Sequence, residues 1–162
     1  MEKINIYDKN KRLLDKITDR HNIIDNEYEL CVHCFIMDEN GKILIQKRSM
    51  NKKYQPGKWT VCGGGVELGE EVHAAAIREV KEEIGINILE ENLEFILSIK
   101  RNEFFLDVYL ARQNYDINEI KIDKNELSEV KAVTIEELKN MIENNEISNN
   151  IKIYFDTFIN LI

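Results

Sequence analysis

Residues 59–86 read WTVCGGGVELGEEVHAAAIREVKEEIGI, and they carry the strongest structural signal in the chain. Its second half predicts a helix over residues 72–84, because apolar or small side chains recur there at helical spacing. Gly85 follows as the expected stop of that helix. Glu70 and Glu71 are expected in its first turn, where the helix dipole favours negative charge.

Three acidic side chains share one face of the predicted helix. Glu79, Glu82 and Glu83 stand at positions i, i+3 and i+4, so their carboxylates crowd together and repel. Two explanations fit this cluster. It is either a solvated acidic face balanced by Arg78 and Lys81, or a site for hard divalent cations. Carboxylate oxygens suit magnesium or manganese, which also bridge to the phosphates of a substrate.

Backbone-special residues are concentrated ahead of the helix. All seven glycines lie within residues 41–85, five of them within residues 57–69, and the single proline is Pro56. Glycine permits tight turns and close backbone approach. We therefore expect the run Gly63–Gly65 to turn tightly and to bring its carbonyls and amides against a metal ion or a phosphate. This expectation favours the cation site over the solvated face.

Length and composition limit the class of protein. The chain has 162 residues, of which 43% are apolar and 32% charged. At roughly 150 residues per domain, this length predicts one domain with a real core. The apolar share is too high for a disordered chain, and charges interrupt every apolar run before it could span a membrane. A formal net charge of −8 disfavours a protein that coats nucleic acid, although a metal ion can mediate contact with a nucleotide.

The first residues and the cysteines bear on location. The opening MEKINIYDKN lacks the apolar core of a signal peptide, so we expect a cytoplasmic protein. Cys31, Cys34 and Cys62 are expected to be reduced thiols in that compartment. Cys31 and Cys34 do not form half of a metal site, because on a strand they point to opposite faces.

The remaining residues predict a mixed α/β domain. Residues 1–27 are a polar lead-in, either a short strand or irregular. Periodicity and turn signals predict strands at 28–37, 42–48, 93–100, 104–111 and 129–134, and helices at 72–84, 135–145 and 150–162. Thr134 is the expected cap of the second helix. Strands with interspersed helices, and too few βαβ units for a doubly wound fold, predict a mixed sheet packed between helices.

Residues 64–86 resemble the Nudix box, G-x5-E-x7-R-E-U-x-E-E-x-G-U, where U is a bulky aliphatic residue. Seven fixed matches would arise by chance on the order of once in 10⁸ placements. The matching residues are Gly64, Glu70, Arg78, Glu79, Glu82, Glu83 and Gly85, with Val80 and Ile86 at the aliphatic positions. LIQKRS at 44–49, PGKW at 56–59, and ELSEV followed by TIEEL also look like their Nudix counterparts. The resemblance implies one Nudix domain over residues 1–162, folded as an α/β/α sandwich with a mixed β-sheet.

The resemblance also implies an activity. Nudix hydrolases cleave a diphosphate linkage in a nucleoside diphosphate joined to another group, using Mg²⁺ or Mn²⁺ to neutralise the diphosphate and activate water. By this resemblance Glu79, Glu82 and Glu83 are metal ligands, joined by the Gly64 carbonyl. Three other residues of the box, Glu70, Arg78 and Gly85, are structural by the same resemblance, with Arg78 orienting the glutamates.

Family members differ in the source of the general base. Some use a glutamate of the box, which makes Glu82 a catalytic candidate, and others use a glutamate from a later loop. Glu126 resembles the later position and is our candidate, with Glu129 and Glu103 as rivals.

Two basic residues end the strand ahead of the glycine segment and are candidates for contacting substrate phosphates. These are Lys47 and Arg48. Only one of two adjacent strand residues can face the site, and we favour Arg48.

Two other functions remain open. The lead-in INIYDKN, Arg20-His21 and KRS at 47–49 resemble Nudix proteins related to isopentenyl diphosphate isomerase. Such an isomerase needs a placed cysteine, and counting back from Gly69 puts that position at Gly63 rather than Cys62. A non-catalytic nucleotide-binding module is the other alternative, but such modules tend to lose glutamates of the box.

We expect a small diphosphate compound as the partner, with no nucleic acid polymer and no membrane. The expected assembly is a monomer or a homodimer. The identity of the substrate depends on loops and pocket side chains outside the box.

Overall fold

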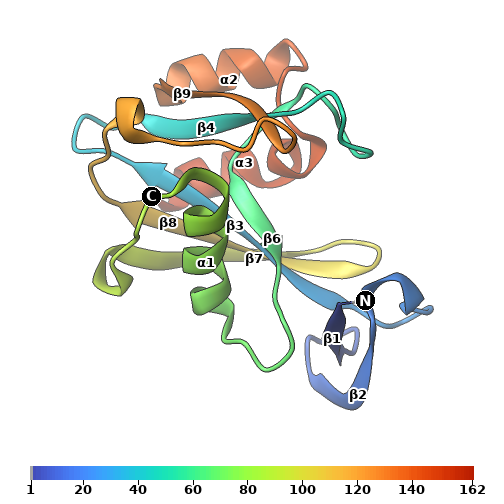
Figure 1. The fold of residues 1–162 in the computed structure, drawn as a ribbon. Coiled ribbons are helices and arrows are strands. Elements are labelled where there is room, and N and C mark those ends of the chain that lie inside the picture. Colours follow the sequence, from blue (N-terminus) through green and yellow to red (C-terminus); the bar gives the residue numbers. More distant parts are fainter. Residues whose placement is uncertain (1) are drawn as a thin grey trace.

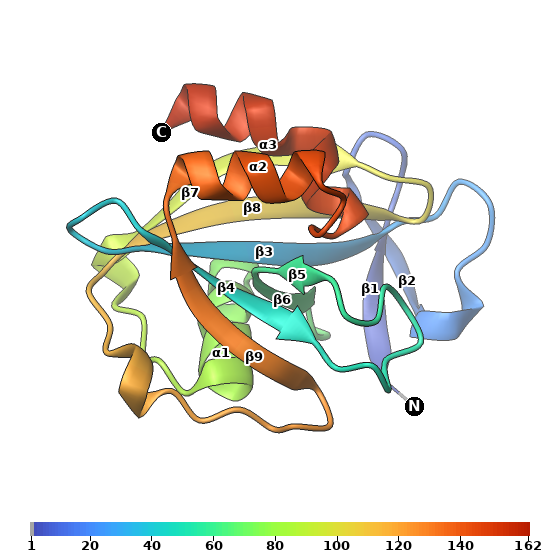
Figure 2. The ribbon, with the colours of Figure 1, turned by 90° about the horizontal axis from the view of Figure 1, so that it is seen from above.

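The computed structural model describes residues 2–162 and has three layers. A seven-stranded sheet separates α1 on one face from α2 and α3 on the other (Figures 1 and 2). The strands are β1 (Lys3–Tyr7), β2 (Leu13–Asp19), β3 (Glu29–Met37), β4 (Ile43–Arg48), β5 (Trp59–Thr60), β6 (Cys62–Gly65), β7 (Leu93–Lys100), β8 (Phe104–Arg112) and β9 (Leu127–Val133). The helices are α1 (Val72–Ile84), α2 (Ile135–Glu143) and α3 (Asn149–Leu161), with short 3-10 turns η1 (Arg20–Asn22), η2 (Glu90–Asn92) and η3 (Ile117–Glu119).

The sheet is mixed, as predicted, and β3 is its centre. β3 runs parallel to β8 and antiparallel to β6, while β7 pairs with β8 and β9 pairs with β4. The predicted hairpin forms around Gly41, whose φ of 75° suits a turn. Its strands then diverge, so that β3 and β4 share only the pair Met37↔Ile43. The chain from β5 to β6 crosses this divergence, pairing first with β4 and then with β3.

Each face of the sheet buries its own apolar cluster, because strand side chains alternate between faces. Along β3, Val32 and Cys34 belong to the cluster under α1, while Phe35 and Met37 belong to the cluster under α2 and α3. Helix α2 begins with the capping box expected at Thr134. These two cores hold the sheet rigid between its helices.

The lead-in folds into a hairpin of its own. β1 and β2 form a separate two-stranded sheet, and β1 buries Ile4 and Ile6. Two ion pairs attach the lead-in to the main sheet, one from the turn of the hairpin and one from η1. Lys11 Nζ lies 2.5 Å from Asp107 Oδ1 on β8, and Arg20 Nε lies 2.8 Å from Glu29 Oε2 on β3. Residues 2–27 therefore supply packed structure beside β3 and β8.

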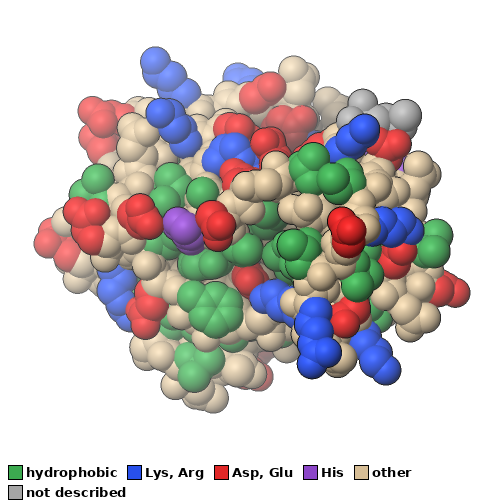
Figure 3. Space-filling view, turned by 90° about the horizontal axis from the view of Figure 1, so that it is seen from below, with side chains coloured by type: hydrophobic (Ala, Val, Ile, Leu, Met, Phe, Trp, Pro, Cys, Tyr) green, Lys and Arg blue, Asp and Glu red, His purple; other side chains and the backbone are tan. Residues whose placement is uncertain are grey.

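The surface carries both signs of charge. On the face shown in Figure 3, Lys and Arg side chains lie among Asp and Glu side chains, with apolar side chains between them. Among residues 2–162, no helix is both long enough and apolar enough to cross a bilayer.

The expectation that Gly63–Gly65 turns tightly is wrong. These glycines form the extended strand β6, and none of them has a positive φ. They are needed because β6 is closely packed on all sides. A Cβ at Gly63 would lie 2.3 Å from the Val32 carbonyl oxygen, and one at Gly64 would lie 2.3 Å from a Glu79 carboxylate oxygen. A Cβ at Gly65 would overlap the Arg20 guanidinium.

A substitution at Gly63 tests this packing. We expect Gly63→Ala to lower the free energy of unfolding by about 2 kcal/mol or more, because the methyl group meets backbone rather than a movable side chain. Gly69→Ala is the control, since its φ of 76° is strained for alanine but its space is open, and it should cost only about 1 kcal/mol. Urea unfolding measures both, and a Gly63→Ala protein as stable as wild type would contradict the account.

Candidate active site

Helix α1 presents the acidic residues of the site. It runs from Val72 to Ile84 as predicted, and Gly85 ends it with a φ of 75° and an amide that donates to the Lys81 carbonyl. Its buried stripe packs on the sheet. That stripe consists of Ala75, Ala76, Val80 and Ile84.

Glu70 and Glu71 are not in the first turn of α1, contrary to expectation. Glu71 is the N-cap residue, and Glu70 precedes it. The Glu70 carboxylate accepts from the Glu67 amide and from Arg78 instead of lying along the helix. Its position is therefore set by the loop ahead of α1.

Glu79 is pressed against strand β6. Its side chain is only 14% exposed, and its carboxylate occupies the space that a side chain at position 64 would need. Burial raises the pKa of Glu79, and the neighbouring Arg78 opposes that rise. The absence of a side chain on Gly64 is what allows this carboxylate to reach the backbone.

Glu83 lies one helical turn further along α1. Its Oε2 accepts a 2.5 Å hydrogen bond from Nε2 of Gln46 on β4. Burial raises the pKa of Glu83 to about 7, while the Gln46 amide, the Gly63 backbone N–H and the Cys62 thiol lower it. Among residues 2–162, Glu83 has no lysine, arginine or histidine within salt-bridge distance.

Arg78 links the loop ahead of α1 to the helix. It forms a two-point pair with the Glu70 carboxylate, at 2.8 and 3.0 Å. It also donates to Glu79 at 2.9 Å, to Glu82 at 3.2 Å and to the Gly65 carbonyl at 3.0 Å. Such a planar, multiply bonded guanidinium fixes the direction of the carboxylates around it.

The carboxylates are close to one another but do not converge on a single point. Among the described residues, no group of three or more His, Cys, Asp or Glu side chains is arranged to hold an ion. Glu79 and Glu82 both turn to Arg78, and Glu83 turns to Gln46. The donor set nevertheless fits a hard divalent cation, because it offers carboxylate oxygens and includes a buried carboxylate with no cation beside it.

The two basic residues at the end of β4 point in different directions. The Lys47 ammonium lies 5.6 Å from the centre of the Trp59 ring and 3.3 Å from Glu129, on the face opposite to the Gln46 side chain. The Arg48 guanidinium donates to the Tyr54 carbonyl at 2.9 Å, and a register shift separates it from Lys47.

The candidate bases occupy separate places. Glu126 ends the loop before β9, its carbonyl accepts from the Ser49 amide, and its carboxylate pairs with Lys52. Glu129 lies on β9 beside Lys47. Glu103 lies in the turn between β7 and β8, where its carbonyl accepts from the Glu29 amide at the start of β3. Glu126 and Glu129 thus adjoin β4, while Glu103 adjoins the start of β3.

Comparison with known proteins identifies the family. The NUDIX domain model matches residues 27–154. The chain is 32% identical over 141 residues to the uncharacterized Nudix hydrolase lmo0368 of Listeria monocytogenes, which covers 86% of this chain and 83% of that protein. The chain belongs to the Nudix family. It is a Nudix hydrolase, an enzyme that hydrolyses pyrophosphate bonds in small molecules, and members of this family generally use divalent metal ions.

Solved structures confirm the predicted Nudix fold, and the MutT protein of Methanosarcina mazei superposes with a TM-score of 0.65 at 25% identity, covering 82% of this chain and 94% of that one. DR0079 from Deinococcus radiodurans superposes with a TM-score of 0.80 at 20% identity, covering 97% of this chain and 99% of that one. The predicted likeness to isomerases is partial. Isopentenyl-diphosphate Delta-isomerase of Mycolicibacterium vanbaalenii is 37% identical over 60 residues, which is 36% of this chain and 33% of that protein.

A pocket of about 200 Å³ adjoins strand β6 of this Nudix hydrolase. Backbone of Gly63–Gly65 forms one wall, and His33 of β3, Phe104 of β8 and Asn150 of α3 line it as well. The segment before α3 is held there by hydrogen bonds between Trp59 and residues 146–148. Sequence reasoning missed this grouping, because no motif relates residues so far apart in the chain.

The cysteines of the Nudix hydrolase are unpaired thiols. Cys34 lies in the cluster under α1, while Cys31 packs toward the cluster on the other face, as strand alternation requires. Cys62 is buried between β4 and α1, and burial raises its pKa well above the ordinary value. A buried, protonated thiol of this kind is a poor nucleophile.

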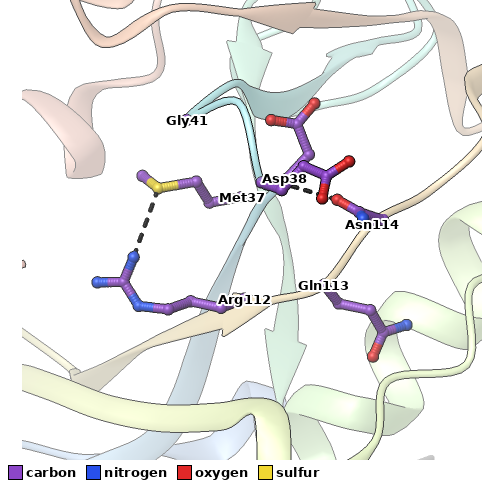
Figure 4. Close-up of a pocket in the computed structure, with 7 residues that line it drawn as sticks. Met37, Asp38, Gly41, Arg112, Gln113 and Asn114 are labelled. Carbon is purple, nitrogen blue, oxygen red and sulfur yellow. Dashed lines mark hydrogen bonds between the residues drawn. The ribbon is translucent and has the colours of Figure 1, made fainter.

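A larger pocket, of about 390 Å³, lies at the turn between β3 and β4 (Figure 4). The Asp38 carboxylate accepts two backbone N–H bonds from that turn, and Asn114 accepts another from Glu39. Arg112 points across the pocket to the sulfur of Met37 at 3.7 Å. These polar groups secure the turn to the end of β8, so we assign the pocket a structural role.

His33 supplies a pH test of the pocket beside β6. It is half-buried, its Nδ1 lies 2.7 Å from the Tyr154 hydroxyl, and loss of water around the ring together with the Arg48 charge lowers its pKa from 6.5 to about 4. The unfolded chain therefore binds a proton near pH 6.5 that the folded chain binds only near pH 4. The stability contributed by neutral His33 is complete above pH 6.5 and is lost as the pH falls toward 4, by up to about 3 kcal/mol.

The variant His33→Gln keeps an acceptor for the Tyr154 hydroxyl but does not titrate. Urea unfolding at a series of pH values should show a flatter decline in its free energy of unfolding between pH 6.5 and 4 than wild type shows. Equal declines in the two proteins would mean that His33 already titrates normally in the folded state.

Proposed function

We propose that this Nudix hydrolase depends on a divalent metal ion and cleaves the diphosphate linkage of a nucleoside diphosphate joined to another group. The observation that carries the proposal is the placement of Glu79 and Glu83. One carboxylate is held against the backbone of Gly64, and the other is buried with no cationic side chain beside it. Burying the Glu83 carboxylate without a compensating charge is unfavourable, and a bound cation removes that cost.

The proposed ligands are Glu79, Glu82 and Glu83, with the Gly64 carbonyl as a further oxygen donor. Mg²⁺ or Mn²⁺ matches this all-oxygen set. When bound, the ion neutralises the diphosphate and lowers the pKa of a water molecule. Arg78 keeps the carboxylates of Glu79 and Glu82 directed while no substrate is present.

Glu126 is the proposed general base, and its place along β4 supports it. Gln46 on β4 contacts Glu83, and the Ser49 amide three residues later donates to the Glu126 carbonyl. The Glu126 backbone therefore lies beside the end of β4, and its exposed carboxylate, which pairs with Lys52, can release that partner to accept a proton from the attacking water. Glu82 is the alternative general base, within the Nudix box, and it would then act both as a base and as a metal ligand.

Arg48 is the proposed phosphate contact in preference to Lys47. Lys47 is directed at Trp59 and Glu129, so its ammonium is already used on the face away from Glu83. Arg48 follows it at the end of β4, and among residues 2–162 its guanidinium hydrogen-bonds only to the Tyr54 backbone carbonyl in the loop. A guanidinium in that position can release the carbonyl and bind two phosphate oxygens at once.

The pocket beside β6 is the proposed place for the nucleoside. Phe104 offers a ring for stacking, and Asn150 offers both a donor and an acceptor for the edge of a base. Since Gly63–Gly65 forms one wall of the pocket and Gly64 also contacts Glu79, the strand separates the two sites by a single backbone thickness.

We further propose that the protein works in the cytoplasm as a monomer or homodimer and that residues 1–162 form one domain. The free thiols of Cys31, Cys34 and Cys62 are typical of a reducing compartment. The ion pairs from Lys11 and Arg20 to the main sheet support a single folding unit.

Hydrolysis by variants tests the site. We expect Glu82→Gln combined with Glu83→Gln to lower kcat/KM by about 100-fold or more on every active substrate, because ligands are lost. Release of phosphate or mononucleotide is measured with Mg²⁺ over a panel of dinucleotides, nucleotide sugars and oxidised nucleotides.

The same assay tests the general base and the metal. Glu126→Gln should lower kcat while metal binding is retained, and EDTA should abolish turnover until Mg²⁺ or Mn²⁺ is restored.

The control is Glu136→Gln, an exposed acidic residue on α2 in the opposite layer, which should behave as wild type. A double variant that is as active as wild type on all substrates would rule out the metal site.

A further assay with isopentenyl diphosphate as substrate tests isomerisation. The burial of Cys62 predicts no isomerisation, because its thiol cannot reach a substrate.

A further inference from the structure

Gln46 connects two groups at the candidate site. It is a polar side chain on β4 and is only 3% exposed. Its Nε2 donates to Glu83 at 2.5 Å, and its Oε1 accepts from the Cys62 thiol at 3.2 Å. The Cys62 thiol also lies beside the Glu83 carboxylate, so Cys62, Gln46 and Glu83 form one side-chain cluster that joins β6, β4 and α1.

The direction of the Gln46 amide matters for Glu83. A carboxamide is nearly symmetric in shape, but one end donates and the other accepts. A flipped amide would place its oxygen against the Glu83 carboxylate and its N–H against the sulfur of Cys62. The Cys62 thiol supplies the hydrogen that favours the observed direction, in which the amide donates to Glu83. Buried polar groups of this kind fix one geometry when all are satisfied.

We infer that Gln46 and Cys62 are positioning residues for Glu83, with the thiol fixing the Gln46 amide and the amide holding the carboxylate toward the metal site. The inference rests on the proposed function, in which Glu83 is a ligand. Partners that hold a ligating group are commonly worth about 10- to 100-fold in metal affinity. In this role Cys62 is not a nucleophile, and it does more than fill space in the apolar cluster, because its thiol orients the Gln46 amide.

Cys34 provides a matched control. It faces Cys62 directly in the register of β3 and β6, and it is equally buried, at 1% exposed against 5%. Among residues 2–162, its sulfur has a hydrogen bond to the adjacent Phe35 carbonyl, at 3.8 Å, and none to Gln46 or Glu83. Removing the Cys34 thiol therefore leaves a similar cavity in the same apolar cluster without removing a hydrogen bond to Gln46 or Glu83.

Binding of Mn²⁺ to the full-length protein, followed by electron paramagnetic resonance, tests the inference without requiring turnover. We expect Gln46→Leu and Cys62→Ala to weaken Mn²⁺ binding by about 10- to 100-fold, and kcat to fall more than KM rises. Cys62→Ser keeps a donor and should bind Mn²⁺ nearly as wild type. Cys34→Ala should also bind as wild type. Urea unfolding of each variant verifies that it is folded at the temperature of the titration.

The outcomes separate the inference from the function beneath it. If Cys62→Ala binds Mn²⁺ as tightly as Cys34→Ala, or if Cys62→Ser binds as weakly as Cys62→Ala, the thiol does not act through its hydrogen bond. Gln46→Leu tests the amide even if Cys62→Ala fails to fold. Glu83→Gln is the reference. If it loses Mn²⁺ while Gln46→Leu keeps it, only the positioning role is wrong. If wild type binds no Mn²⁺, or if Glu83→Gln binds Mn²⁺ as tightly as wild type, the metal site itself fails.

Discussion

The structure depends on the contact between the acidic helix α1 and the side-chain-free strand β6. The Glu79 carboxylate fills the volume that any side chain at Gly64 would take. Carboxylates held this close to backbone and sheet lose water, which raises the pKa of both Glu79 and Glu83. Arg78 offsets the cost at Glu79, and the proposed cation offsets it at Glu83. The same crowding makes glycine necessary at position 64 and favours binding of a cation at the site.

The divergence of β3 and β4 creates the place where this contact occurs. The two strands meet once, at Met37↔Ile43, and then leave room for β6 to pair with β3. Gln46 on β4 can then reach Glu83 from the other side of the opening. A regular hairpin would have filled that space with ladder hydrogen bonds, and α1 would have packed on side chains instead of on glycine backbone.

Much of the fold could be predicted from local pattern. The period of 3.6 residues places α1 at residues 72–84, and Thr134 starts α2 through a capping box. Strand β6 could not be predicted in this way, because a run of glycines has no hydrophobic period and its extended form is stabilised by pairing with β3. The same reason led to the mistaken expectation of a turn at Gly63–Gly65.

The family, the acidic helix and the glutamates that share one face of it could be predicted from residue spacing, because each follows from the pattern along a single element. Tertiary packing instead directs Lys47 away from Glu83 and Gln46 toward it, and brings Cys62 to Gln46. These facts depend on how separate strands and α1 pack against one another. Distances between elements are set by the packing of the whole chain, and no local sequence pattern encodes them.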